Sequence, residues 1–494
     1  SDWSSYFLTG AASGAYYDQR PTNATTTVAL AAENFTDWRP AVGNIANVNL
    51  NGVAEADFDT AFDSLNDGAK RWWLGYGFAP GLKAWTSMVT SYSGTTWAPE
   101  YGNLGGMVVH GGGHGGNIGQ FSYVFDFESF KWRQVGAPRN LPPDLDWAGY
   151  LSPPSSTKTN AAGPSDSRDP DWMDYLWNGS YVAFSDHEYV QNGYVSPAEG
   201  GGRLGSLYLP QATFSQDPGV ADPFTGIAFQ HRPHLFDLAT GKVTRATSAT
   251  LGTWNGYSAT LTIKDTTRNR LWFFPNSTPA CSYLDLSSGP PYTRTTHTMQ
   301  KASGGNATWF SANNSAGLYV PEADAIVVFS PTRQNEGNPA TADGPLTLWV
   351  YTMNTGVPVD RETWSNPSVP TQAMARGGFI VGCAWCPWVG PNGAFYLYEG
   401  FGANYCYVLT PSSRNFATCT WAWTRESFGG ATPVYKAAVN LLDAQRLAPQ
   451  GKFVAVPGLQ CIALHDGPDT SGVCADGVTR DAIVQLFRPP GTTI

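Results

Sequence analysis

The sequence predicts an all-β protein, folded as a single β-propeller of six or seven four-stranded blades. Three observations support this prediction: a repeated strand unit, a low content of charge and a high content of aromatic and turn-forming residues. Charged residues make up 14% of the 494 residues, against roughly 25% in an ordinary soluble domain. Aromatic residues also reach 14%, with 19 Trp, and there are 54 Gly and 36 Pro. This composition is typical of short strands joined by polar loops.

The repeat unit reads as an apolar strand, a turn with Pro or Asp, a second apolar strand, a loop and an aromatic strand. Six copies can be recognised, and their recognisable strands begin at Gly105, Gly205, Tyr257, Gly317, Gly378 and Lys452. Each copy spans about 45 to 65 residues, which is the length of a propeller blade. One small sheet cannot bury both of its faces, whereas sheets packed around an axis can, and ring closure leaves only short edges.

Apolar runs with an Asp at the centre recur in three copies. They are Phe-Asp-Phe ending at Phe127, Phe-Asp-Leu ending at Leu238 and Leu-Asp-Leu ending at Leu286. Apolar and polar residues alternate in each run, which predicts half-buried outer strands.

The chain divides into an N-terminal segment, residues 1–84, and the propeller, residues 85–494. A helix is expected in the first part over Asp57–Lys70, where Phe58, Phe62 and Leu65 share one face. We expect the same segment to contribute strands that close the ring. Two long insertions, Leu141–Asp174 and Gln211–Phe229, are expected to be loops on the surface of the scaffold.

Charge and hydropathy restrict the partners. The net charge of −10 disfavours nucleic acid, because phosphate binding needs a basic face. No run of 18 apolar residues is present, so no membrane span is expected. The chain begins with Ser1, and we expect that it starts after processing of a leader.

Seven cysteines fall mostly late in the chain. Equal spacing pairs Cys406 with Cys419 and Cys461 with Cys474, and both pairs are expected to form disulfides. Cys383 and Cys386 could bridge each other or hold a metal, and Cys281 is left over. Disulfides imply an oxidising compartment, so the protein is expected to be secreted or exposed on a cell surface or virion. N-x-S/T sequons, such as those at Asn23 and Asn34, are compatible with a glycoprotein.

The run Gly111-Gly-Gly-His114, followed by Val124-Phe-Asp-Phe127 and Trp132, resembles the kelch and galactose-oxidase-type propeller superfamily. The resemblance covers roughly residues 85–490 and implies a bacterial or phage secreted propeller. Members of this type include oxidases, polysaccharide lyases and binding modules, so the fold alone does not select a function. Many bacterial members carry an Arg-His-Thr-Tyr strand where this chain reads Gly200-Gly-Gly-Arg203-Leu-Gly205, so the His and Tyr are absent.

A polysaccharide lyase is the enzyme class that the candidate residues fit best. β-Elimination from a uronic-acid polysaccharide needs neutralisation of the carboxylate, a base for the C5 proton and an acid for the leaving oxygen. We assign the proton transfers to His114, His231 and Tyr194, with Tyr208 as an alternative Tyr. Substrate binding is assigned to Arg203, Arg232, His234, His110 and Trp97.

A non-enzymatic surface, appendage or virion protein is the alternative hypothesis. Its Trp-rich segments, including Trp385-Cys-Pro-Trp388 and Trp421-Ala-Trp423, offer flat faces on which sugar rings can stack. In both hypotheses the partner is a polysaccharide or glycan, and self-assembly fits the second. No cofactor is expected, although propeller loops can bind calcium; no Asp-rich cluster indicates such a site.

Overall fold

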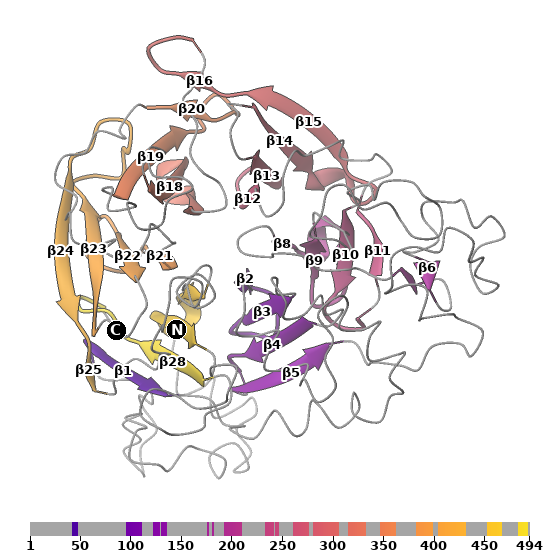
Figure 1. Cartoon of the computed structure of the whole chain (residues 1–494), viewed down its shortest axis with the longest axis horizontal. Helices are drawn as coiled ribbons and strands as arrows, with labels where there is room; N and C mark the ends of the chain where they lie inside the picture. The colour runs from indigo at the N-terminus through magenta and orange to yellow at the C-terminus, as the bar shows by residue number, and fades with distance from the viewer. Residues whose placement is uncertain are drawn as a thin grey trace, which may run out of the picture.

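The computed structural model describes part of the chain, which carries all of the elements discussed below. The described residues are 42–47, 95–110, 122–128, 130–135, 175–176, 180–181, 192–209, 233–241, 243–246, 260–275, 280–305, 315–331, 346–361, 382–398, 404–430, 452–466 and 483–492. They form six mainly antiparallel sheets arranged in a ring (Figure 1). The prediction of an all-β propeller is therefore confirmed. The helix expected over Asp57–Lys70 and both long insertions fall outside the described residues.

We number the sheets as blades 1 to 6 along the chain. Blade 1 contains β2 (Thr95–Ala98), β3 (Gly106–His110), β4 (Ser122–Asp126) and β5 (Lys131–Val135). Blade 2 contains β8 (Gly193–Val195), β9 (Ser206–Leu209), β10 (His234–Asp237), β11 (Val243–Arg245), β7 (Ser180–Tyr181) and β6 (Tyr175–Leu176). Blade 3 contains β12 (Thr260–Asp265), β13 (Arg270–Pro275), β14 (Ala280–Asp285) and β15 (Thr293–Thr298).

The second half of the ring repeats this order. Blade 4 contains β17 (Ala316–Val320), β18 (Ala325–Pro331), β19 (Leu346–Thr352), β20 (Val359–Asp360) and β16 (Gln300–Lys301). Blade 5 contains β21 (Gly382–Cys386), β22 (Ala394–Tyr398), β23 (Tyr405–Pro411) and β24 (Trp421–Ser427). Blade 6 contains β26 (Phe453–Val456), β27 (Cys461–Asp466), β28 (Ile483–Phe487), β1 (Asn44–Asn47) and β25 (Gly429–Gly430). Short 3₁₀ turns occur at η3 (Pro197–Glu199), η4 (Leu286–Ser288), η6 (Pro321–Ala323) and η10 (Pro457–Leu459).

The first strands of the blades surround the centre of the ring. β2, β8, β12, β17, β21 and β26 contact one another in that order, and β26 returns to contact β2. Blade 6 combines distant parts of the chain, because β1 pairs antiparallel with β28, with Ile45 opposite Phe487 (Figure 1). Both ends of the described chain are thus joined in one sheet.

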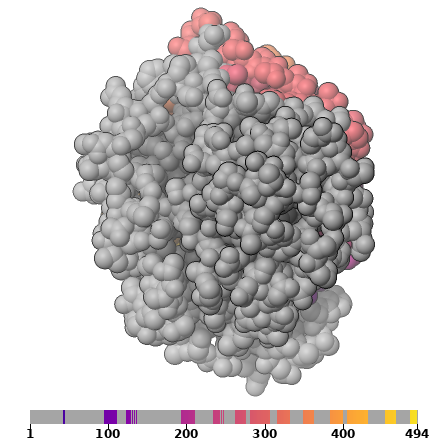
Figure 2. All heavy atoms as spheres, turned by 45° about the vertical axis from the view of Figure 1, so that its right-hand side comes forward, coloured from indigo at the N-terminus to yellow at the C-terminus, as the bar shows by residue number. Residues whose placement is uncertain are grey.

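The middle strands are buried on both faces because each blade packs between two others. β3, β4 and β22 are buried at every residue. The prediction that the Phe-Asp-Phe run forms a half-buried outer strand is wrong, since β4 is the third strand and lies inside the ring wall. Outermost strands are more exposed: Thr293, Thr295, Thr296 and Thr298 of β15 reach solvent, and Figure 2 shows this part of the chain at the molecular surface.

The aspartates of these runs end the third strands and shape the turn to the fourth strand. Asp126 Oδ1 accepts a hydrogen bond from the Glu128 backbone N–H at 2.9 Å. Asp237 Oδ1 accepts from the Ala239 N–H at 2.7 Å, and Asp285 Oδ1 accepts from the Ser287 N–H at 3.0 Å. This local bond mimics a backbone turn, which explains why Asp recurs there.

One residue with positive φ precedes the second strand of every blade. These residues are Gly105, Gly205, Asn269, Asp324, Gly393 and Gln460. In blades 1 to 4 the carbonyl of this residue accepts a hydrogen bond from the N–H that follows the third strand, as in Phe127 N to Gly105 O at 3.2 Å. Recurrence at the same place in six sheets shows that the blades are structural repeats.

Candidate functional site

The first turn of each blade lies on one face of the ring, which we call the turn face. On this face, in each of blades 2 to 5, a side chain from the first strand contacts the first turn of the preceding blade. The Tyr194 hydroxyl donates to the Leu204 carbonyl at 3.3 Å, and burial and its interaction with Glu100 raise its pKa. Lys264 forms an ion pair with Glu199. Tyr319 Oη and Thr267 Oγ1 share a hydrogen bond of 2.7 Å, and Trp385 Nε1 donates to Glu322 Oε2 at 3.2 Å. We call these four interactions the interblade latches.

The latches occupy equivalent positions. In each latch, the residue on the first strand lies opposite the second residue of the second strand in the same blade. The pairs are Tyr194–Leu207, Lys264–Leu271, Tyr319–Ile326 and Trp385–Phe395. The corresponding residues of blades 1 and 6 are Trp97 and Ala455, opposite Met107 and Ile462. The preceding turns there contain Gly458 and Trp388 at the place of the acceptor. The latch pattern therefore joins blades 1 through 5 and is not repeated on either side of blade 6.

The latch between blades 2 and 3 is the most buried. The side chains of Glu199 and Lys264 are 7% and 22% exposed. Ser196 holds the carboxylate, because its backbone N–H and its hydroxyl both donate to Glu199 Oε2 at 2.9 Å. Tyr292 Oη donates to the Glu199 carbonyl at 2.8 Å. Burial lowers the pKa of Lys264, while the Glu199 carboxylate opposes that shift.

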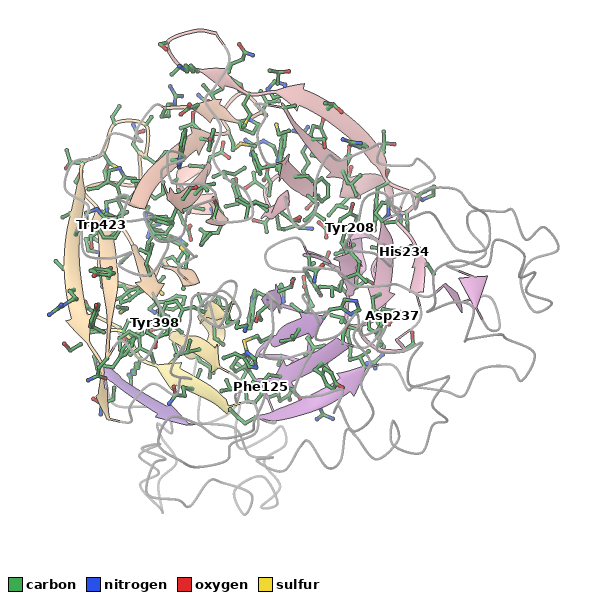
Figure 3. All side chains as sticks on the ribbon, in the orientation of Figure 1. Phe125, Tyr208, His234, Asp237, Tyr398 and Trp423 are labelled. Atoms are coloured by element: carbon green, nitrogen blue, oxygen red, sulfur yellow. The ribbon has the colours of Figure 1, made fainter. Side chains whose placement is uncertain are left out.

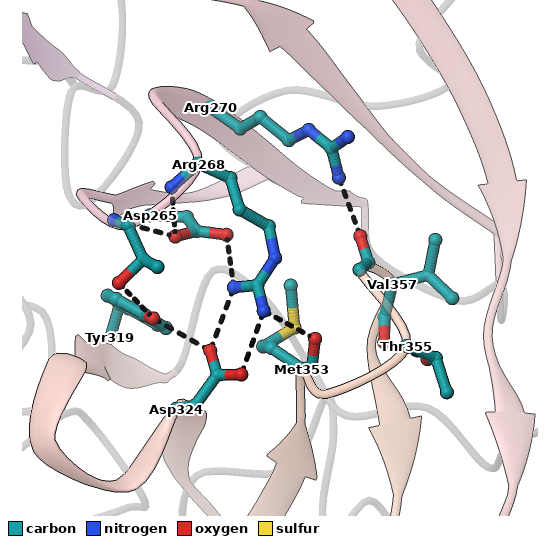
Figure 4. Close-up of polar contacts among 10 residues, drawn as sticks. Asp265, Arg268, Arg270, Tyr319, Asp324, Met353, Thr355 and Val357 are labelled. Carbon is teal, nitrogen blue, oxygen red and sulfur yellow. Dashed lines mark hydrogen bonds and ion pairs between the residues drawn. The ribbon is translucent and has the colours of Figure 1, made fainter.

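Blades 3 and 4 are joined by an arginine fork (Figure 4). Arg268 Nη1 and Nη2 donate to the two carboxylate oxygens of Asp324 at 2.8 Å each. The same guanidinium donates to the Met353 carbonyl at 2.7 Å and to Asp265 Oδ2 at 3.2 Å. The Tyr319 hydroxyl donates to Asp324 Oδ1 at 2.8 Å. These bonds, led by the one from Arg268, lower the pKa of Asp324.

We predict that Arg268→Gln makes the free energy of unfolding less dependent on pH in the acidic range. The Asp324 pKa is lower in the folded than in the unfolded state, so the unfolded state binds more protons in the acidic range. The stability that the fork contributes is present above the ordinary Asp pKa and is lost as the pH falls through the folded pKa. The free energy of unfolding by urea, measured across the acidic range, should therefore fall less steeply in the variant.

Arg270→Gln is the matched control, because Arg270 joins the same blades through a neutral acceptor. Its Nη1 donates to the Gly356 carbonyl at 2.6 Å. Arg270 makes only the smallest contribution to the lowered pKa of Asp285, so the acid slope of this variant should stay closer to that of the unsubstituted protein than the slope of Arg268→Gln does. Equal slopes in all three proteins would contradict the assignment.

Three of the predicted site residues lie on the turn face. Tyr194 is buried, and its ring packs on Gly205, where an added Cβ would lie 2.2 Å from the Tyr hydroxyl oxygen. Burial and Glu100 raise the pKa of Tyr194, so the hydroxyl stays protonated and serves as a latch. Trp97 packs on Gly105 in the same way. Arg203 is exposed on the turn between β8 and β9.

Two other predicted residues lie at the opposite end of blades 1 and 2, which we call the loop face. His110 is the last residue of β3 and His234 is the first residue of β10, and both side chains are fully buried. His110 Nδ1 shares a hydrogen bond of 2.8 Å with Ser122 Oγ. Its ring lies 5.5 Å from that of Phe236, two residues beyond His234 (Figure 3 labels His234). The structure thus brings His110 and His234 to the same interface.

His114, His231 and Arg232 fall outside the described residues. The connections that carry them, residues 111–121 and 210–233, start or end at the two buried histidines. Within the part of the chain that the structure describes, no group of three or more His, Cys, Asp and Glu side chains is arranged to hold a metal.

The predicted disulfides are corrected where both cysteines are described. Cys383 and Cys386 are three residues apart on β21 and so point to opposite faces of the sheet; one contacts the core toward blade 4 and the other the core toward blade 6. Cys406 pairs with Glu426 near one end of the β23–β24 hairpin, whereas Cys419 precedes β24 at the other end. A disulfide needs two cysteines whose Cβ atoms are close and point toward each other, so neither pair can form one, and all four cysteines are free. Cys474 is not among the described residues, so Cys461–Cys474 stays a prediction.

The latches were missed in the sequence, although a signal was present. Pro and Glu follow the first strand in Trp97-Ala-Pro-Glu100, in Pro197-Ala-Glu199 and in Tyr319-Val-Pro-Glu322. A Glu one or two residues after a Pro at the end of the first strand indicates a repeated contact, but the partner lies in the next blade. A search for paired repeats would have been needed to find it.

No family model and no curated protein matches this chain. Among solved structures it is distantly similar to hydrazine synthase from Kuenenia stuttgartiensis, with a TM-score of 0.35 and 10% identity over 80% of this chain and 83% of that one. It is also distantly similar to the major allergen Mala s 1 of Malassezia sympodialis, with a TM-score of 0.33 and 10% identity over 75% of this chain and 89% of that one. No helix in the described residues has the length and apolar character of a membrane span.

Proposed function

We propose that this protein is a secreted propeller of the kelch and galactose-oxidase type that binds a polysaccharide on its loop face. The observation that carries the proposal is the proximity of the buried ends of β3 and β10. His110 contacts Phe236 across blades 1 and 2, and the connections attached at His110 and His234 hold His114, His231 and Arg232. Two connections that together carry His114, His231 and Arg232 therefore leave neighbouring blades at the same face.

The chemistry of these residues fits a uronic-acid polysaccharide. Arg can bind a carboxylate through two parallel hydrogen bonds, and this neutralises the charge that otherwise opposes removal of the C5 proton. His titrates near neutral pH and can take that proton or deliver one to the leaving oxygen. We therefore propose Arg232 for the carboxylate and His114 and His231 for the proton transfers.

Tyr194 and Arg203 are left out of this proposed site. Tyr194 is a latch, and both residues lie on the turn face, whereas His110 and His234 lie on the loop face. His110 and His234 themselves are fully buried, so we assign them a supporting role. They hold the bases of the two connections.

A second candidate function is non-catalytic recognition, on a cell surface, an appendage or a virion. It is favoured by the burial of His110, His234 and Tyr194, because these candidates are engaged in holding blades together. Binding of a glycan without cleavage is the outcome that distinguishes this function.

The experiment is incubation of the full chain with a panel of uronic-acid polysaccharides, with ultraviolet absorbance of the unsaturated product as the readout. We expect product from at least one polymer, and Arg232→Gln should lower the rate by about 100-fold, as for loss of one electrostatic stabiliser. Arg203→Gln is the matched control on the opposite face and should leave the rate unchanged. Binding without product would support the non-catalytic function, and absence of both would contradict glycan recognition on the loop face.

A further inference from the structure

We propose that the outer rim of blade 5 is a second glycan-binding surface, specific for sugar chains that carry carboxylate or sulfate groups. The surface consists of Trp421, Trp423 and Arg425 on β24 with Tyr405 on β23, and we call it the rim cluster. It lies in a different blade from the proposed loop-face site and does not depend on it. Figure 3 labels Trp423 at the periphery of the ring.

The strand register places the rim cluster on one face of the sheet. Trp421, Trp423 and Arg425 alternate along β24, so their side chains point to the same side. They lie opposite Pro411, Leu409 and Tyr407 of β23, and Tyr405 follows at the next same-face position, opposite Ser427. A row of two indoles, one guanidinium and one phenol therefore runs along the edge of the blade.

The neighbouring blade covers this row only in part. Trp423 contacts blade 4 through Phe329, with ring centroids 6.5 Å apart. The fourth strand of blade 4, β20, has two residues; it pairs with Tyr351 and Thr352 of β19 on one side and with the two-residue strand β16 on the other. Trp421 packs on Phe416 of its own blade, with ring centroids 4.9 Å apart. Both indoles are partly exposed, and Arg425 is exposed.

The arginine of the rim cluster is held in place but not neutralised. Its guanidinium carbon lies 4.6 Å from the centroid of the Tyr405 ring. Stacking of this kind fixes the plane of the guanidinium and leaves its N–H edge available for a planar anion. Among the described residues, no carboxylate forms an ion pair with Arg425.

Blade 3 contains a similar pair that serves structure instead. Arg270 lies 4.3 Å from the centroid of the Tyr283 ring, but its Nη1 donates to the Gly356 carbonyl of blade 4 at 2.6 Å. Arg425 has no such backbone acceptor among the described residues. Of these two described Arg–Tyr stacks, the one in blade 3 donates to a backbone acceptor in the next blade, and the one in blade 5 does not.

These features select an anionic sugar as the ligand. Flat aromatic faces accept the C–H face of a pyranose ring, and the arginine fork accepts a carboxylate or sulfate through two hydrogen bonds. The chain as a whole carries a net charge of −10, so an anionic ligand would be attracted only at a local cation such as this one.

The test uses the full chain with three hexasaccharides: one of polygalacturonate, one of chondroitin sulfate and one of neutral cellulose. Binding is followed by tryptophan fluorescence and by calorimetry. We expect at least one anionic probe to bind, and the neutral probe to bind about tenfold more weakly or not at all. Comparison of the two anionic probes identifies whether carboxylate or sulfate is preferred.

Arg425→Gln should weaken binding of the anionic probe about tenfold, which corresponds to one charge-assisted hydrogen bond. Arg133→Gln is the matched control, since Arg133 is exposed on the outermost strand of blade 1 and pairs with Asp126 at 3.1 Å. Trp423→Phe keeps an aromatic face and should retain most of the affinity, whereas Trp423→Ala should lose it.

Equal binding by Arg425→Gln and the unsubstituted protein would overturn the proposal, as would equal affinity for the neutral probe or no binding of any probe. Arg425→Gln is a surface change, so this outcome does not depend on whether Trp423→Ala folds. Arg232→Gln should leave rim binding unchanged while it lowers cleavage, and this separates failure of the rim cluster from failure of the loop-face site.

Discussion

Gly393→Ala is expected to destabilise the protein by about 3 kcal/mol. Gly393 has a φ of +81°, and a Cβ there would lie 2.4 Å from both Cζ2 and Cη2 of Trp385. The left-handed backbone costs an L-residue roughly 1–2 kcal/mol, and displacement of a packed ring adds typically 1–3 kcal/mol. Trp385 cannot yield easily, because it is also the donor of the latch to Glu322. Urea unfolding of the purified variant measures the loss.

Gly390→Ala provides the control for this prediction within the same turn. Gly390 also has a positive φ, +62°, but nothing lies within 4 Å of the position that an added Cβ would take. It should therefore show only the backbone cost of roughly 1–2 kcal/mol. If the two variants lost the same stability, packing of Trp385 on the glycine would contribute nothing and the latch geometry would be a coincidence of the fold.

The repeat makes the fold predictable from the sequence, because the strands of each repeat can be identified from short stretches of neighbouring residues. Phe-Asp-Phe at 125–127 and the Val-Val-Phe run at 327–329 identify strands from neighbouring residues alone. Strand β27, by contrast, has no clear pattern, since Cys461–Asp466 mixes small, polar and apolar residues. Pairing of β1 with β28 joins Ile45 to Phe487, and no local pattern identifies a partner so distant in the chain.

The candidate site is harder to predict because burial depends on the neighbouring blade. The glycine run next to His110 suggests an accessible side chain, yet Phe236 of blade 2 covers it. Tyr194 is predicted from the sequence to move protons, but burial and Glu100 of blade 1 raise its pKa, so the hydroxyl stays protonated. In both cases the deciding contact comes from another repeat. Sequence pattern shows what a blade contains, whereas it does not show which side chains the next blade encloses.

Glu199→Gln is expected to cost about 3 kcal/mol of stability. Removal of one partner from a buried ion pair leaves the other charge without compensation, which typically costs 3–5 kcal/mol, and the 22% exposure of the Lys264 side chain favours the lower end. Glu199 and Lys264 are 65 residues apart in the sequence, so the loss also removes a contact that joins blades 2 and 3.

The pH dependence of this variant has a definite sign. Burial already lowers the pKa of Lys264, and without the Glu199 carboxylate that pKa should fall further. The unfolded state then binds more protons than the folded state between the folded and unfolded Lys pKa values, so stability rises with pH in that window. The deficit of Glu199→Gln relative to the unsubstituted protein should shrink from neutral toward alkaline pH.

The double variant Glu199→Gln/Lys264→Met separates the ion pair from the local packing. With neither charge present no uncompensated ion remains, and we expect the double variant to recover most of the stability lost in Glu199→Gln. Urea unfolding of the two single variants and the double variant completes the cycle. Simple additivity of the two losses would mean that Glu199 and Lys264 contribute independently, and the latch between blades 2 and 3 would then be a contact without energetic coupling.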